Sequence, residues 1–164
     1  MQLPDMDKPE AAAREVRLVY ADGSARTVYV TETEEPFPEG RLIVSRTDLQ
    51  GIITNANDAF VEMSGWARED LIGAPQNILR HPDIPKVTFK GLWDDLAAGK
   101  KWHGYLKNLR KDGSFYWVYA TAVPNVRNGQ VVGYTSVRRK PSRTRIAEVI
   151  PVYAQLLAEE NAAP

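Results

Sequence analysis

The chain contains no cysteine among its 164 residues. Without a thiol it can form no disulfide, no thiolate metal site and no covalent intermediate on cysteine. It also lacks a glycine-rich nicotinamide-binding fingerprint after a strand, a nucleophile–base pair and any recognisable spacing of metal ligands. These absences argue against an enzyme.

Two further absences concern charge and hydrophobic length. Lysine and arginine (21 residues) balance aspartate and glutamate (21 residues), so the net charge is zero, and no bulk attraction would hold the chain to nucleic acid. No apolar run approaches the ~18 residues that a membrane span needs, and there is no signal peptide. We expect a soluble, cytoplasmic protein without membrane insertion and without a nucleic-acid partner.

What the chain does contain is a pattern of strands and helices typical of one α+β domain with two extensions. Residues 1–40 are expected to form an N-terminal extension with a β-hairpin that turns at Asp22-Gly23. Residues 41–139 are expected to form the main domain, and residues 140–164 a C-terminal amphipathic helix.

The main domain is predicted to be a five-stranded antiparallel sheet with helices on one face, because strands precede and follow a block of helices. The expected strands are 41–48, 49–57, 102–110, 114–126 and 129–139, and the expected helices are 59–66, 67–73 and 85–100.

The sequence also predicts the order of the N-terminal segment and the shape of the C-terminal helix. Residues 1–13 are polar and contain proline, which predicts loose order. The C-terminal helix has one apolar stripe, and Pro151 lies within it. Because proline offers no N–H to the carbonyl four residues earlier, a kink or break is expected there.

Four stretches of the sequence resemble PAS domains and, more narrowly, the flavin-binding PAS domain of Aer-type aerotaxis and energy-taxis receptors. They are "TNANDAF" (54–60), "NILRHPDIPK" (77–86), "KNLRKDGSFYWV" (107–118) and "GYTSVRRKPSR" (133–143). The combination of "RHPDIP" with "KNLRKDG" carries the narrower resemblance, because PAS domains in general bind many different cofactors or none.

The resemblance implies a PAS fold that holds FAD noncovalently between sheet and helices, with FMN as the alternative, and that senses redox state, oxygen or energy supply. In that family the flavin's oxidation state reaches a histidine-kinase pathway through a membrane-anchored receptor. This chain ends at Pro164 without a membrane segment or signalling output domain. We therefore expect either a fragment or a free-standing sensor that docks onto a separate output protein or receptor, and a homodimer through terminal helices.

Residues of one strand and one helix would meet the flavin ring. Leu106 and Asn108 alternate along the strand 102–110 and therefore share a face. The Asn108 amide can donate or accept a hydrogen bond at the ring edge, and so could follow a change in redox state. Trp93 lies on the apolar face of the helix 85–100, where it could stack on the ring or on adenine, or belong to the core.

The segment before that helix offers charge. Arg80 and His81 can present positive or switchable charge to an anionic flavin or a diphosphate. Asp83, stiffened by nearby prolines, could orient Arg80 or bond to ribose. Asn57 could reach the ligand or could only cap the helix that follows it.

Alternatives remain open at this point. A haem-based gas sensor would take His81 or His103 as its axial ligand. A ligand-free interaction module would fill the hollow with its own side chains. The light-driven flavin–cysteine adduct of LOV-type PAS domains is excluded, because the chain has no cysteine.

Overall fold

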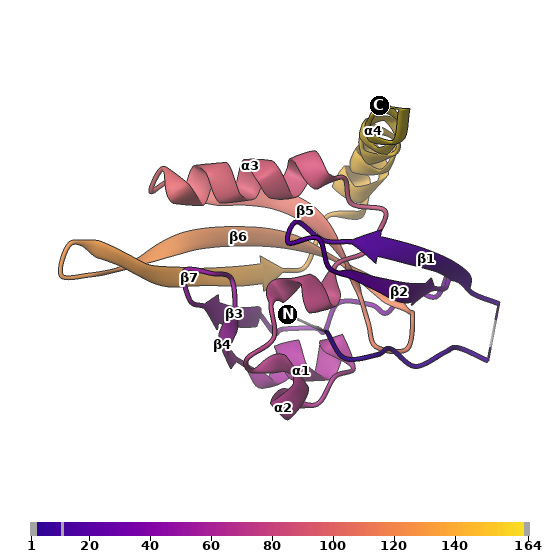
Figure 1. Cartoon of the computed structure of the whole chain (residues 1–164), viewed down its shortest axis with the longest axis horizontal. Helices are drawn as coiled ribbons and strands as arrows, with labels where there is room; N and C mark the ends of the chain where they lie inside the picture. Colours follow the sequence, from indigo (N-terminus) through magenta and orange to yellow (C-terminus); the bar gives the residue numbers. More distant parts are fainter. Residues whose placement is uncertain (1–2, 11, 163–164) are drawn as a thin grey trace.

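The protein, described as a computed structural model over residues 3–10 and 12–162, is built around a five-stranded antiparallel sheet in the order β4-β3-β7-β6-β5 (Figure 1). The strands are β3 (Ile43–Thr47), β4 (Ile53–Ala56), β5 (Trp102–Leu109), β6 (Phe115–Arg127) and β7 (Gln130–Arg139). The α+β class and the five-stranded antiparallel sheet predicted from the sequence are confirmed.

The helices between β4 and β5 are short until α3. They are α1 (Asp58–Ser64), α2 (Arg68–Leu71), the 3-10 turn η1 (Gln76–Leu79) and α3 (Lys86–Ala97). Helix α1 begins at Asn57, whose side chain accepts a hydrogen bond from the Phe60 amide, and ends at Gly65 in the left-handed conformation. Helix α3 packs along β5 and β6 (Figure 1).

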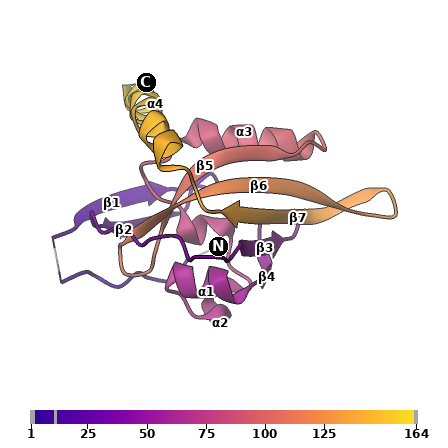
Figure 2. The ribbon, with the colours of Figure 1, turned by 180° about the vertical axis from the view of Figure 1, so that it is seen from behind.

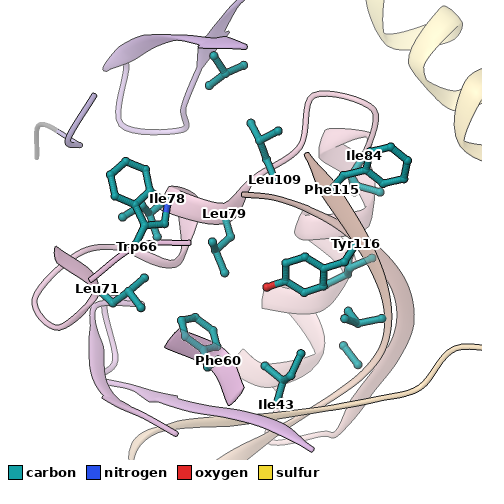
Figure 3. Close-up of a cluster of buried hydrophobic side chains, with 14 of the residues drawn as sticks. Ile43, Phe60, Trp66, Leu71, Ile78, Leu79, Ile84, Leu109, Phe115 and Tyr116 are labelled. Carbon is teal, nitrogen blue, oxygen red and sulfur yellow. The ribbon is translucent and has the colours of Figure 1, made fainter. Parts of the chain in front are cut away.

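The core lies between the sheet and these short helices. Phe60 from α1, Leu71 from α2 and Ile78 from η1 are almost fully buried and meet Ile43 and Tyr116 from the sheet (Figure 3).

The N-terminal extension forms a separate two-stranded hairpin, β1 (Arg14–Val19) and β2 (Ala25–Val30). It is fixed to the main domain, because the Thr31 amide donates to the Gly113 carbonyl and the Phe115 amide donates to the Thr33 carbonyl. A side chain at position 113 would come within 2.9 Å of the Tyr29 carbonyl, so this contact requires glycine.

The prediction of loose order for residues 1–13 is wrong for residues 3–10. Leu3 and Met6 are buried in the core, and the Asp7 amide donates to the Lys111 carbonyl. Two apolar side chains in an otherwise polar segment are enough to anchor it. Residues 1, 2 and 11 lie outside the described residues.

Helix α4 (Arg143–Ala162) follows shortly after β7, and its C-terminal part contacts the N-terminal end of α3 (Figures 1 and 2). Of the kink or break expected at Pro151, the break is wrong, because the helix continues through that residue, and the kink stays a prediction. The carbonyl without its usual partner belongs to exposed Ala147, where water can satisfy it. Ile146 is buried, whereas Ile150 on the expected stripe is half exposed.

Candidate functional site

A cavity of about 380 Å³ lies between the sheet and α3. Its size falls in the range of about 300–1,000 Å³ that is typical of small-molecule sites. Strands β5, β6 and β7 line one side and α3 another, and the turn between β1 and β2 contributes further residues. The cavity therefore draws on both the main domain and the N-terminal extension.

Two of its walls are apolar. Phe89, Leu92 and Leu96 on α3 share one helix face and line the cavity together with Leu106 on β5 and Ala120 on β6. The small side chain of Ala120 leaves space above the sheet. Apolar walls on a helix and on a sheet suit the two faces of a flat aromatic ring.

Trp93 also lines the cavity and is 39% exposed. Its ring meets the ring of Tyr134 edge-on, with centroids 5.5 Å apart. A side chain at position 51 would come within 3.3 Å of the Trp93 indole, and Gly51 leaves that space free. Trp93 therefore belongs to the rim of the cavity rather than to the core.

Arg138, on β7, places a guanidinium group in the cavity lining. The side chain is almost fully buried and donates to the Ser45 hydroxyl at 3.1 Å, and Gln76 donates to the same hydroxyl at 2.8 Å. Burial lowers the pKa of Arg138 to about 10, so the group stays cationic at neutral pH. No carboxylate among the described residues forms an ion pair with it, and a buried cation in this state favours an anionic or electron-rich ligand.

Arg80 and Asn108 meet at the end of β5. They form an isolated antiparallel bridge, and both line the cavity. Asn108 is buried, and the Arg80 guanidinium lies 5.0 Å from the centre of the Phe89 ring. The Arg80 Nε is buried without a hydrogen-bond partner among the described residues, and burial lowers the pKa of Arg80.

His81 and Asp83 lie behind this part of the site and are not among the described residues that line it. The His81 Nδ1 accepts a hydrogen bond from the Asp83 amide. Burial, reinforced by the Lys107 ammonium, lowers the pKa of His81 to about 3, so His81 is neutral at physiological pH rather than the positive or switchable group expected. Asp83 receives hydrogen bonds from Arg14 on β1 and Lys107 on β5 and so ties the hairpin to the sheet.

Asn57 is not part of the described cavity lining, and its side chain forms hydrogen bonds to backbone groups. The amide oxygen accepts from the Phe60 and Val44 amides, and the amide nitrogen donates to the Leu42 carbonyl. In this structure the residue caps α1 and joins it to the start of β3.

Of the seven residues selected from the sequence, the structure brings four together around the cavity, namely Arg80, Trp93, Leu106 and Asn108. Sequence reasoning missed Arg138 and Tyr134. Alternation along "GYTSVRR" places Tyr134, Ser136 and Arg138 on one strand face, a signal that could have found them. No comparable signal in the sequence relates Tyr20 to the cavity that it lines.

No group of three or more histidine, aspartate or glutamate side chains is placed to hold a metal ion within residues 3–10 and 12–162. Within the same residues, no helix has the length and hydrophobicity required to span a membrane.

Comparison with known proteins places the chain in a family. Residues 53–138 match the PAS fold family, and the chain belongs to it. Among solved structures, the PAS domain of a Colwellia psychrerythraea protein is similar, with a TM-score of 0.52, 29% identity and coverage of 62% of this chain and 87% of that one. A light-oxygen-voltage domain studied with a flavin analogue is also similar, with a TM-score of 0.57, 25% identity and coverage of 74% and 87%.

Among curated proteins, the chain is similar to the aerotaxis receptor of Escherichia coli strain K12. The two are 46% identical over 130 residues, which is 79% of this chain and 26% of the receptor. The chain thus spans about a quarter of the length of that relative.

Proposed function

We propose that this chain is a flavin-binding PAS sensor of bacterial signal transduction and that it responds to the redox state of FAD. One observation carries the proposal: an apolar cavity with two guanidinium groups in its lining, Arg80 and Arg138, neither of which forms an ion pair with a described residue, although the Glu160 carboxylate attracts Arg80 from further away. The similarity to an aerotaxis receptor and to a light-oxygen-voltage domain supports it.

The residues present fit a flavin. The apolar walls of α3 and β6 suit the ring faces, and Asn108, Gln76 and Arg138 offer donors and acceptors to a polar edge. Arg80, whose Nε lacks a partner among the described residues, supplies charge beside Asn108. A flavin supplies reversible electron transfer when bound, and its potential depends on nearby charge.

Asn108 is the residue we assign to detection. Its amide can present either its oxygen or its nitrogen to a ring nitrogen, and so can match a group that changes from acceptor to donor on reduction. Asn108 lies on β5, three residues after Tyr105, whose backbone carbonyl accepts a hydrogen bond from Tyr153 on α4 at 2.6 Å. A rearrangement at Asn108 can therefore reach α4 along a single strand.

Two observations disfavour the alternatives. Neither His81 nor His103, the two histidines of the chain, lines the cavity, so a haem there would find no imidazole ligand. A ligand-free interaction module would have no need of a hollow of about 380 Å³ whose lining includes two guanidinium groups.

The remaining assignments belong to the same proposal. The sensor is not an enzyme, acts in the cytoplasm, and passes its state through α4 to an output region or a separate receptor. It forms a homodimer. Its chromophore is FAD rather than FMN.

The experiment is the absorption spectrum of the purified chain, followed by release and chromatographic identification of the chromophore. The two absorption bands of an oxidised flavin, with FAD in the released fraction, are expected. Arg80→Ala should lower the flavin content per protein, whereas Arg127→Ala, an exposed arginine outside the cavity lining, should not. A Soret band, or a folded protein that takes up no flavin, would contradict the proposal.

A further inference from the structure

A second hollow, of about 650 Å³, lies next to the flavin cavity and is formed by the N-terminal extension. Leu3, Tyr20 and Ser24 belong to the linings of both hollows. Every described residue of the second hollow lies between positions 3 and 29, outside the region 53–138 that matches the PAS fold family. The extension therefore adds a compartment to the site.

The second hollow is basic. Lys8, Arg17 and Arg26 line it, and Asp5 is the one carboxylate in its described lining. None of the three cations forms an ion pair with a described residue. Lys8 and Arg17 are exposed, so they can move toward an incoming anion without breaking an ion pair to a described residue.

Arg26 gives this compartment a fixed positive charge. It is 7% exposed, and its terminal nitrogens donate to the Pro4 carbonyl at 3.0 Å and the Ile78 carbonyl at 3.2 Å. These neutral acceptors hold the guanidinium in place but do not neutralise it, and its Nε has no partner among the described residues. A buried cation without a counter-charge is costly, and an anionic ligand nearby would offset that cost.

Tyr20 stands where the two hollows meet. It is buried, and three charged groups lie near it: Arg26 in the second hollow, and Arg80 and the Asp22 carboxylate in the first. Burial and Asp22 raise the pKa of Tyr20 although both arginines act to lower it, so the tyrosine is neutral. A chain of phosphates that passes Tyr20 would have guanidinium groups on both sides.

We infer that the second hollow binds the diphosphate and nucleoside part of a dinucleotide whose ring system lies in the first, so that the N-terminal extension selects FAD over smaller flavins. This inference rests on the proposed function. The first hollow supplies apolar walls for a ring, and the second supplies the cations that a diphosphate requires.

The test compares FAD with riboflavin, which has the same ring system and no phosphate. Binding of each to the flavin-free protein is measured by calorimetry for the wild type, for Lys8→Glu/Arg17→Glu, and for the control Lys101→Glu/Arg127→Glu. The control makes the same change of charge at exposed residues outside both linings. Circular dichroism verifies that each variant is folded.

We expect the Lys8→Glu/Arg17→Glu variant to bind FAD at least about tenfold more weakly, with riboflavin affinity unchanged, because two attractions to phosphate become repulsions. The control should bind both ligands as the wild type does. Unchanged FAD affinity, or an equal loss for both ligands, would overturn the inference while leaving flavin binding intact. If the wild type binds neither ligand, the proposed function itself fails.

Discussion

Arg138 is the residue whose surroundings say most about the site. It is almost fully buried on β7, and among the described residues it is held by one hydroxyl and by the ring of Phe60, 5.0 Å from its guanidinium. Neither partner carries a negative charge. A cation in this position would stabilise electrons added to the ring system of a flavin bound in the cavity.

Replacing that charge should lower the potential of the bound flavin. We expect Arg138→Gln to lower the two-electron midpoint potential by about 30–60 mV, since a hydrogen bond to a charged group contributes about 1.5–3 kcal/mol and 30 mV is about 1.4 kcal/mol. Spectroelectrochemical titration measures the midpoint potential. The control is Arg139→Gln, the exposed next residue on the other face of the strand. Equal potentials in both variants would mean that Arg138 does not act on the ring.

Because His81 is buried in its neutral form, we predict that the protein loses stability as the pH falls. The pKa of His81 is about 3 in the folded protein and about 6.5 in an unfolded chain. Between these values the unfolded chain binds the proton, so stability is complete above about pH 6.5 and falls as pH falls toward 3. The contribution approaches about 1.4 kcal/mol per pH unit in the middle of that window.

His81→Asn keeps an acceptor for the Asp83 amide and removes the titrating group. Although the variant loses stability at pH 7, its unfolding free energy should fall less steeply between pH 6.5 and 4 than that of the wild type. Urea unfolding at several pH values measures the slope. His103→Asn, at the exposed second histidine, should keep the wild-type slope. Parallel slopes for wild type and His81→Asn would contradict a buried neutral imidazole.

At the scale of elements, α4 is held to the sensor by the buried Ile146, by an ion pair between Arg143 and Glu34, and by hydrogen bonds to β5 and α3. Tyr153 donates to the Tyr105 carbonyl on edge strand β5, and the Glu160 carboxylate accepts from the Lys86 amide at the first turn of α3, at 3.0 Å from one of its oxygens. A carboxylate at a helix N-terminus satisfies a free N–H and the helix dipole. The helix thus touches both β5 and α3, elements that line the cavity.

Removing the Tyr153 hydroxyl should loosen α4 without unfolding the domain. One hydrogen bond contributes about 1 kcal/mol, so Tyr153→Phe should accelerate amide exchange in α4 about fivefold. Hydrogen exchange with mass spectrometry localises the change. Gln155→Ala, at an exposed position on the same helix, provides the control. Equal exchange in the two variants would show that this hydrogen bond does not hold the helix.

The sequence predicts those elements that depend on neighbouring residues, and it fails for those that depend on contacts between residues distant in sequence. The turn at Asn128-Gly129 has positive φ at both residues, as a type I′ hairpin turn requires, and the strands around it were predicted within a few residues. Leu3 and Met6 were missed because their partners are distant in sequence. The helix does not break at Pro151, because the residue whose carbonyl loses its hydrogen bond there, Ala147, is exposed to water.

The same distinction applies to the candidate site. Leu106 and Asn108 follow from strand alternation, and Arg80 from its motif, and all three line the cavity. Asn57 and His81 have side chains that suit a ligand, but the fold uses the first as a helix cap and buries the second as a neutral ring. Residue type therefore predicted the chemistry, and only the packing showed which residues line the cavity.

At the scale of the whole molecule, the proposal joins the cavity to α4 through β5. Reduction of the flavin should change amide exchange in α4 of the wild type. Asn108→Leu, which keeps a similar volume but cannot present a donor or acceptor, should still bind flavin and should lose the dependence of α4 exchange on redox state. Asn55→Leu, at an exposed residue on β4, is the control. A redox-dependent change that persists in Asn108→Leu would remove this residue from the signalling route.

The claim that underlies the proposed function and the predictions for Arg138 and Asn108 is that a flavin occupies the cavity between α3 and the sheet. A crystal structure of the purified, coloured protein tests it most directly. We predict density for a three-ring system between Leu92 and Ala120, with Asn108 and Arg138 at its polar edge. A cavity closed by the chain's own side chains, with Arg80 and Asn108 turned out into solvent, would contradict the account.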